Sequence, residues 1–308
     1  MDHGRRPPHG RLPIDAMFPA GVANIRVTRL TLPDGSAVRV AESGAPDAPP
    51  VLLVHGWGAS IYMWRDWFAP LATAGFRAVA VDLPGHGLSD KPTEEGCYRL
   101  EPLVASVRAV IDGAGLHRPH VVAQSMGGSI ALELAVSGEP EIGRLVLVNP
   151  ARFGHVHLIP LARRASPKVV EPVLARLVPR WVVDRAHRRV YGDPSLVTED
   201  DIDQYWAPSQ FPGYAPAMRR LLHEFTWTRP PVSAMVERLC SLKPPTSPPL
   251  VVLGTRDRIV RDARPYAAAL RRAGAPLEIY SSVGGGHAVN EERPGEVLAL
   301  VTAFLGRA

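Results

Sequence analysis

Three residues of this chain could form a serine nucleophile with its base and its acid: Ser125, His287 and Asp257. A serine hydroxyl is a poor nucleophile until a neighbouring base, usually histidine, takes its proton. The histidine in turn needs a carboxylate on its other ring nitrogen, which holds the correct tautomer and stabilises the charged ring. This set of residues predicts that Ser125 attacks a carbonyl carbon.

The residues around Ser125 favour this interpretation. The segment Ala-Gln-Ser-Met-Gly-Gly at positions 123–128 follows a β-branched run and opens an apolar helical stretch. Small residues two before and two after a serine permit a strand-to-helix turn that is too tight for larger side chains. Ala123 stands where that pattern has glycine, which is the smallest departure available. The alternative is that Ser125 only caps the N-terminus of the helix.

The proposed base and acid follow expected strands near the C-terminus. His287 ends the run Gly-Gly-Gly-His at positions 284–287, directly before the last helix, and such a turn can place an imidazole over the sheet edge. Asp257 lies directly beyond the expected strand 250–253. The alternatives are an exposed loop histidine and a turn aspartate between two arginines. Asn149 ends another strand, but an amide cannot supply the negative charge.

Attack on a carbonyl also requires N–H donors where negative charge develops on the oxygen. The backbone N–H of Met126, directly after the serine, is one expected donor. The other is expected from the loop His-Gly-Trp-Gly at positions 55–58, which follows the strand 51–54.

The chain resembles the α/β-hydrolase superfamily from Val51 to the C-terminus. The His-Gly loop, the segment Asp-Leu-Pro-Gly-His-Gly-Leu-Ser-Asp at 82–90, the serine turn, and the aspartate and histidine segments occur in family order. The resemblance implies that Trp57 supplies the second oxyanion N–H. It also implies structural roles for His55, Asp82 and His86.

The expected fold is α/β, an α/β-hydrolase fold with a mostly parallel central sheet flanked by helices and an inserted helical lid. Short β-branched runs alternate with helical stretches, which is typical of such a sheet. Strands are expected at 51–54, 77–82, 120–124, 145–149, 250–253 and 277–280 after a hairpin over 25–42, and helices at 100–114, 126–137, 263–273 and 294–305.

The alternation of strands and helices divides the chain into three parts. Residues 1–24 are expected to be a flexible tail, and residues 25–151 and 249–308 the core. Residues 152–248 contain no convincing strand and end in a proline-rich stretch, so they are expected to form the helical lid.

Composition argues against several other classes of protein. The chain has 308 residues and a net charge of +5, but no nucleic-acid-binding signature, so no nucleic-acid partner is expected. No apolar run approaches the roughly 18 residues of a membrane span, although the arginine-rich stretch 163–189 could contact a membrane surface. With two distant cysteines and no export signal, we expect a cytoplasmic monomer or homodimer. The pair His155 and His157 lacks a third ligand, and no metal or cofactor is expected.

These features predict a serine hydrolase that cleaves a carboxylic ester, thioester or lactone of an apolar small molecule through an acyl-enzyme. Dehalogenases and epoxide hydrolases of the superfamily carry an aspartate at the position of Ser125, so they are excluded. Carbon-carbon bond hydrolases of meta-cleavage-type diketones remain an alternative, although Gln124 and Ala288 depart from their pattern. A non-catalytic binding protein is a second alternative.

Substrate choice is expected to depend on the lid, because its aromatic side chains could form an apolar cleft with those near the His-Gly loop. The lid aromatics are Trp181, Tyr191, Tyr205, Trp206, Phe211, Tyr214, Phe225 and Trp227, and those near the loop are Trp57, Tyr62 and Trp64. The alternative for each ring is a place in the lid's own core.

Overall fold

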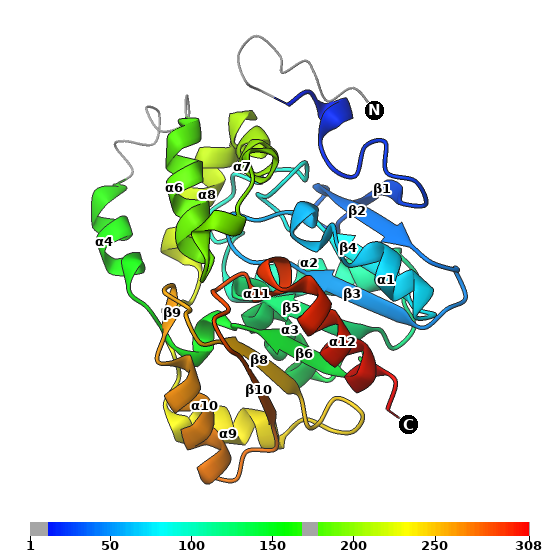
Figure 1. The fold of residues 1–308 in the computed structure, drawn as a ribbon, viewed down its shortest axis with the longest axis vertical. Coiled ribbons are helices and arrows are strands. Elements are labelled where there is room, and N and C mark those ends of the chain that lie inside the picture. Colours follow the sequence, from blue (N-terminus) through cyan, green and yellow to red (C-terminus); the bar gives the residue numbers. More distant parts are fainter. Residues whose placement is uncertain (1–11, 168–177, 308) are drawn as a thin grey trace.

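The computed structural model describes residues 12–167 and 178–307. An eight-stranded sheet runs through the molecule in the order β1-β2-β4-β3-β5-β6-β8-β10 (Figure 1). β2 pairs antiparallel with β1 and β4, and the remaining neighbours are parallel. The strands are β1 Arg26–Thr31, β2 Ala37–Ser43, β3 Pro50–Val54, β4 Arg77–Val81, β5 His120–Gln124, β6 Leu145–Val148, β8 Leu250–Gly254 and β10 Glu278–Ser282.

The central strands are apolar on both faces because helices cover both sides of the sheet. β6 and β8 are buried along their whole length, whereas the edge strand β1 is mostly exposed. Continuous Val and Leu runs are typical of parallel strands buried on both faces. The strands and helices expected from the sequence are present, and their ends differ by no more than two residues.

Two apolar clusters lie on opposite faces of the sheet. The larger one includes side chains from α2 Leu100–Gly113, α3 Met126–Ser137 and α10 Ala263–Arg272. The other includes side chains from η2 Ile61–Trp64, α1 Phe68–Thr73 and α12 Pro294–Leu305. The result is a three-layer arrangement of helices, sheet and helices.

Helices inserted between β6 and β8 gather beyond one end of the sheet (Figure 1). They are α4 Leu158–Ala165, α6 Arg180–Val190, α7 Glu199–Trp206 and α8 Tyr214–Glu224, with the short turns η3 Ala151–Phe153, η5 Pro194–Leu196 and η6 Ala207–Gln210. The lid expected over 152–248 also includes residues 168–177, which lie outside the described residues.

The C-terminal part of the expected lid packs against the core instead of lying above the sheet edge. α9 Val232–Cys240 packs beside α10 of the core, and Tyr266 on α10 donates a hydrogen bond to the Pro230 carbonyl at 2.7 Å. A two-stranded sheet also joins β7 His155–Val156 to β9 Val260–Arg261. The helices above the sheet edge therefore end before α9.

The expected flexible tail over 1–24 lies partly outside the described residues, because these begin at residue 12. The part that is described is packed. After η1 Ile14–Ala16, Met17 is 3% exposed and the Phe18 ring lies 5.8 Å from that of Tyr62. Arg39 donates to the Phe18 carbonyl at 3.2 Å. This contradicts the expectation of a loose tail for residues 17 and 18, since apolar side chains there fill space against the core.

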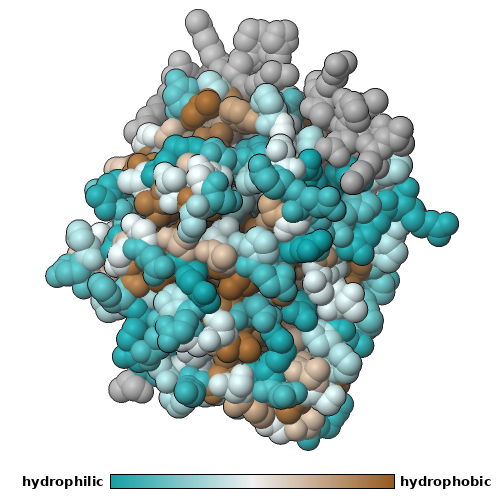
Figure 2. All heavy atoms as spheres, turned by 180° about the vertical axis from the view of Figure 1, so that it is seen from behind, coloured by the Kyte–Doolittle hydropathy of each residue, from teal (hydrophilic) through white to brown (hydrophobic). Residues whose placement is uncertain are grey.

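The surface seen from behind is mainly hydrophilic, with apolar residues scattered over it in small groups (Figure 2). In the described part of the chain, no helix has both the length and the apolar character that crossing a bilayer requires.

One short helix, α11 Val289–Glu292, follows the predicted base His287 and precedes α12.

Candidate active site

Ser125 occupies a strained turn between β5 and α3. Its backbone has φ 51° and ψ −114°, a conformation that non-glycine residues rarely adopt. A Cβ atom at Gly127 would lie 2.5 Å from the His55 carbonyl oxygen, so only glycine fits there. The small residues around the serine therefore allow the tight turn, as the sequence predicts.

Ser125, His287 and Asp257 form one hydrogen-bonded row. His287 Nε2 lies 2.9 Å from Ser125 Oγ, and its Nδ1 lies 2.8 Å from Asp257 Oδ2. Because the carboxylate accepts from Nδ1–H, Nε2 is left to accept the serine proton. The structure thus brings together the three residues that the sequence singled out.

Asp257 is itself held in place by backbone donors. Its Oδ1 accepts from the N–H groups of Ile259 at 2.7 Å and Val260 at 2.9 Å. Its side chain is 5% exposed and that of His287 is 6% exposed, so water has little access to their hydrogen bond. A carboxylate bound in this way stays fixed against the imidazole.

Two amide side chains hold the backbone of His287. Gln124 Nε2 donates to the His287 carbonyl at 3.0 Å, and Asn149 Nδ2 donates to the same oxygen at 2.9 Å. Asn149 Oδ1 accepts from the Gly254 N–H at 2.9 Å, which ties the end of β8 to the histidine loop. The sequence analysis rejected Asn149 as the acid but missed this role; its place at the end of a buried strand was the available signal.

The two predicted oxyanion donors flank Ser125. A Cβ atom at Gly56 would lie 3.0 Å from Ser125 Cβ, so the loop carrying Trp57 packs directly on the nucleophile turn. In the part of the chain that the structure describes, neither the Trp57 N–H nor the Met126 N–H donates a hydrogen bond. Both amides are therefore free to bind an oxygen that gains negative charge.

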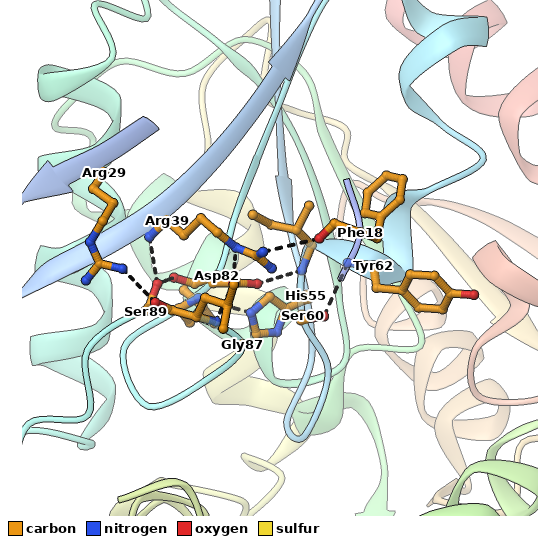
Figure 3. A network of polar contacts seen from close by, with 12 residues as sticks. Phe18, Arg29, Arg39, His55, Ser60, Tyr62, Asp82, Gly87 and Ser89 are labelled. Carbon is orange, nitrogen blue, oxygen red and sulfur yellow. Dashed lines mark hydrogen bonds and ion pairs between the residues drawn. The ribbon is translucent and has the colours of Figure 1, made fainter. Parts of the chain in front are cut away.

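Asp82 lies in a separate network of polar contacts, close to His55 and Ser60 (Figure 3). Its carboxylate accepts from Arg39 Nε at 2.7 Å and from the backbone N–H groups of Ile61 and Leu88. Burial alone would raise the pKa of Asp82, but the Arg39 guanidinium and these donors hold it below its ordinary value. Asp82 faces Arg39 and backbone groups, which favours the structural role implied by the family resemblance.

His55 and His86 are also fully buried. His55 Nε2 accepts from the Leu83 N–H at 3.0 Å, which leaves Nδ1–H to donate to the Gly56 carbonyl at 2.7 Å. Burial lowers the pKa of both rings, and for His86 the neighbouring His55 adds to the effect. Both imidazoles are therefore neutral, and their hydrogen bonds shape the loops around the site.

The other residues considered from the sequence lie apart from the triad. The rings of His155 and His157 stack with centroids 6.3 Å apart, and both side chains are exposed. Among residues 12–167 and 178–307, no cluster of three or more His, Cys, Asp or Glu side chains could hold a metal ion. Cys97 and Cys240 are free thiols.

Residues 51–300 match the alpha/beta hydrolase family. The chain belongs to this family. This confirms the family resemblance and the fold predicted from the sequence.

Among its relatives, this α/β hydrolase is 26% identical to the dihydrolipoyllysine-residue acetyltransferase component of the acetoin cleaving system of Pseudomonas putida. That alignment covers 88% of this chain and 67% of the relative.

Solved α/β hydrolase structures share the fold. Epoxide hydrolase CorEH superimposes with a TM-score of 0.74 at 21% identity, covering 91% of this chain and 98% of that one. The 2-hydroxy-6-oxo-6-phenylhexa-2,4-dienoate hydrolase from Rhodococcus sp. strain RHA1 gives a TM-score of 0.73 at 20% identity, covering 92% and 100%. At these identities the likeness concerns the fold and leaves the substrate open.

Proposed function

We propose that this α/β hydrolase cleaves a carboxylic ester or thioester of a small apolar molecule. Ser125 is the nucleophile, His287 the general base and Asp257 the acid that orients it. The observation that carries the proposal is the row of hydrogen bonds from Ser125 Oγ through the imidazole to the Asp257 carboxylate.

The first half of the reaction forms an acyl-enzyme. His287 Nε2 takes the proton of Ser125 as Oγ attacks the substrate carbonyl carbon, and the oxygen that becomes negative binds the N–H groups of Trp57 and Met126. When the tetrahedral intermediate collapses, the bond to the alcohol or thiol breaks and His287 returns the proton to that leaving group. The acyl group remains on Ser125.

The second half releases the acid. His287 takes a proton from water, whose oxygen attacks the acyl carbon, and the same two N–H groups bind the second oxyanion. Collapse breaks the bond to Ser125 Oγ, which regains a proton from the imidazolium. Asp257 stays ionised throughout and stabilises the charged ring.

The region above the sheet edge supports the proposal that a lid shapes the substrate site. The Trp227 ring, which follows α8, lies 5.8 Å from the ring of Trp57 and meets it edge-on. Trp57 also carries one of the proposed oxyanion donors. A side chain from the inserted region thus contacts the loop at which the substrate carbonyl would bind, and we propose that this region, up to about Trp227, is the lid.

Carbon-carbon bond cleavage of a meta-cleavage-type diketone is the second candidate, and the fold matches that of the 2-hydroxy-6-oxo-6-phenylhexa-2,4-dienoate hydrolase along most of this chain. A serine, histidine and aspartate row suits that reaction as well. Direct comparison of substrates is needed to separate the two.

The test is hydrolysis of p-nitrophenyl butyrate beside a meta-cleavage-type diketone by wild type, Ser125→Ala and Ser129→Ala. Ser129 lies one helical turn further on, is buried and has no hydrogen-bond partner at Oγ within the described ranges, so it is a matched control. We expect Ser125→Ala to lose at least about 10⁴-fold in ester turnover and Ser129→Ala to keep it. Unchanged turnover in Ser125→Ala would reject the proposal, and faster diketone cleavage would favour the second candidate.

A further inference from the structure

Glu292 is a buried carboxylate that the proposed chemistry does not use. It ends α11, is 8% exposed, and in the described part of the chain pairs with no basic side chain. Its oxygens accept from three backbone N–H groups instead: Gly286 at 2.7 Å, Gly192 at 3.0 Å and Asp193 at 2.9 Å. Burying a charge costs free energy unless hydrogen bonds compensate, and these three bonds do so.

The three donors come from two segments that are distant in sequence. Gly286 directly precedes His287, whereas Gly192 and Asp193 follow α6 in the inserted region. The carboxylate therefore joins the histidine loop to the end of α6.

The two segments also touch directly, backbone to backbone. The His287 N–H donates to the Val190 carbonyl at 2.7 Å. A Cβ atom at Gly286 would lie 2.1 Å from the Gly192 nitrogen, and one at Gly192 would lie 2.2 Å from the Gly284 carbonyl oxygen. Both positions need glycine because no side chain fits between the segments.

We propose that Glu292 is a positioning residue for the base of this site. It holds residues 190–193, the last residue of α6 and the three that follow it, against the loop that carries His287. The inference rests on the proposed function, because it assumes that His287 activates Ser125.

The Glu292 carboxylate holds the backbone that precedes His287, and two side-chain amides hold the carbonyl of His287 itself. Glu292 fixes the Gly286 N–H in front of His287, while Gln124 and Asn149 hold the His287 carbonyl behind it. With the backbone fixed on both sides, the imidazole keeps its 2.9 Å distance to Ser125 Oγ. Misplacing a catalytic group by about 1 Å can cost roughly 100-fold in rate, so loosening one side should be measurable.

The test uses the rate at which a fluorophosphonate labels Ser125, because this step needs the activated serine but no knowledge of the substrate. Glu292→Gln keeps the shape but removes the charge and turns one acceptor into a donor. Glu292→Asp keeps the charge but withdraws the oxygens. We expect each variant to label about 10- to 100-fold more slowly at saturating probe, with the concentration for half-maximal rate unchanged within about twofold.

The fraction of protein labelled at completion separates positioning from a role in stability alone. Loss of folded protein lowers this fraction, whereas a misplaced imidazole lowers the rate constant of the protein that remains folded. We therefore expect the rate constant to fall in both Glu292 variants while the labelled fraction at completion stays at the wild-type value. The control is Glu296→Gln, a half-buried glutamate on α12 that accepts from the Tyr280 hydroxyl, and it should match wild type.

The outcomes distinguish this inference from the proposed function. Wild-type labelling rates in whichever Glu292 variant folds would overturn the inference alone. Failure of the wild-type protein to label at Ser125 would instead overturn the proposed function, and the inference with it.

Discussion

At the scale of single residues, burial keeps the side chain of His187 uncharged. His187 on α6 is 6% exposed, and its ring lies tilted against that of Tyr205 with centroids 4.0 Å apart. Among the residues that the structure describes, its Nε2 has no hydrogen-bond partner. Burial lowers its pKa to about 4; the Asp201 carboxylate opposes this shift and the Arg65 guanidinium adds to it. The ring is therefore neutral in the folded protein at neutral pH.

This neutral ring makes stability depend on pH. In the unfolded chain a histidine titrates near pH 6.5, so below that pH the unfolded state binds a proton that folded His187 does not. Stability should fall as the pH drops from about 6.5 towards 4, and at pH 5 the loss due to His187 is about 2 kcal/mol. Urea unfolding of wild type and His187→Phe at pH 7.5 and pH 5 measures it.

We expect His187→Phe to lose less stability than wild type between these pH values, by about that 2 kcal/mol, because phenylalanine binds no proton. His155→Gln, a change at an exposed histidine, should behave as wild type does. Equal losses in wild type and His187→Phe would show that the folded protein protonates His187 as readily as the unfolded chain does.

The residues of the candidate site differ in how far the sequence could predict them. Ser125, Asp257 and His287 lie in short local motifs, each within a few residues of the end of a strand, so spacing and residue type sufficed to propose them. Glu292 carries no such signal, because its partner Gly192 is 100 residues away and only the folded chain brings them together.

At the scale of elements, the helices inserted between β6 and β8 place two tryptophans in different surroundings. The Trp227 ring contacts Trp57 beside the proposed oxyanion site. Trp206, at the end of α7, donates from Nε1 to the Val178 carbonyl at 2.7 Å and is 9% exposed. The sequence could not show which of the two tryptophans lies near the oxyanion loop, because both are aromatic residues in a helical region without strands.

The two tryptophans should therefore differ in their effect on acyl-chain preference. Each methylene buried in an apolar cleft improves transition-state binding by up to about 0.8 kcal/mol, so kcat/KM should climb several-fold from acetyl to hexanoyl p-nitrophenyl esters. Trp227→Ala should flatten this climb while sparing the acetyl ester, and Trp206→Ala should leave its slope unchanged. Equal slopes for wild type and Trp227→Ala would remove Trp227 from the cleft.

The position of α9 and the packed N-terminal segment show where element-scale prediction failed. Helical spacing identified α9 as a helix but not its neighbour, which is α10 of the core rather than the helices above the sheet. Residues 17 and 18 follow a proline-rich stretch without periodicity, yet their side chains fill space beside Tyr62 and Arg39. Both cases depend on tertiary contacts that local patterns do not encode.

At the scale of the whole molecule, the parallel sheet explains why distant motifs meet. Trp57, Ser125, Asn149 and Asp257 each follow the carboxyl end of a strand, namely β3, β5, β6 and β8, which are neighbours in the sheet. Carboxyl ends of parallel strands lie at one edge, and ligand sites of open α/β sheets form there. The strand order thus brings motifs spread over 200 positions into one site, whereas the fold was predictable from the alternation of strands and helices and from the family motifs.

The most direct test of the account is to trap the acyl group on Ser125. Wild-type protein turning over p-nitrophenyl butyrate is quenched with acid within milliseconds, digested and analysed by mass spectrometry, with Ser125→Ala and Asp257→Asn alongside. We predict a butyryl adduct on the peptide containing Ser125 in wild type, no adduct at that position in Ser125→Ala, and adduct formation slowed by about 10⁴-fold in Asp257→Asn. Ester turnover without any adduct on Ser125, or with the acyl group on another residue, would contradict it.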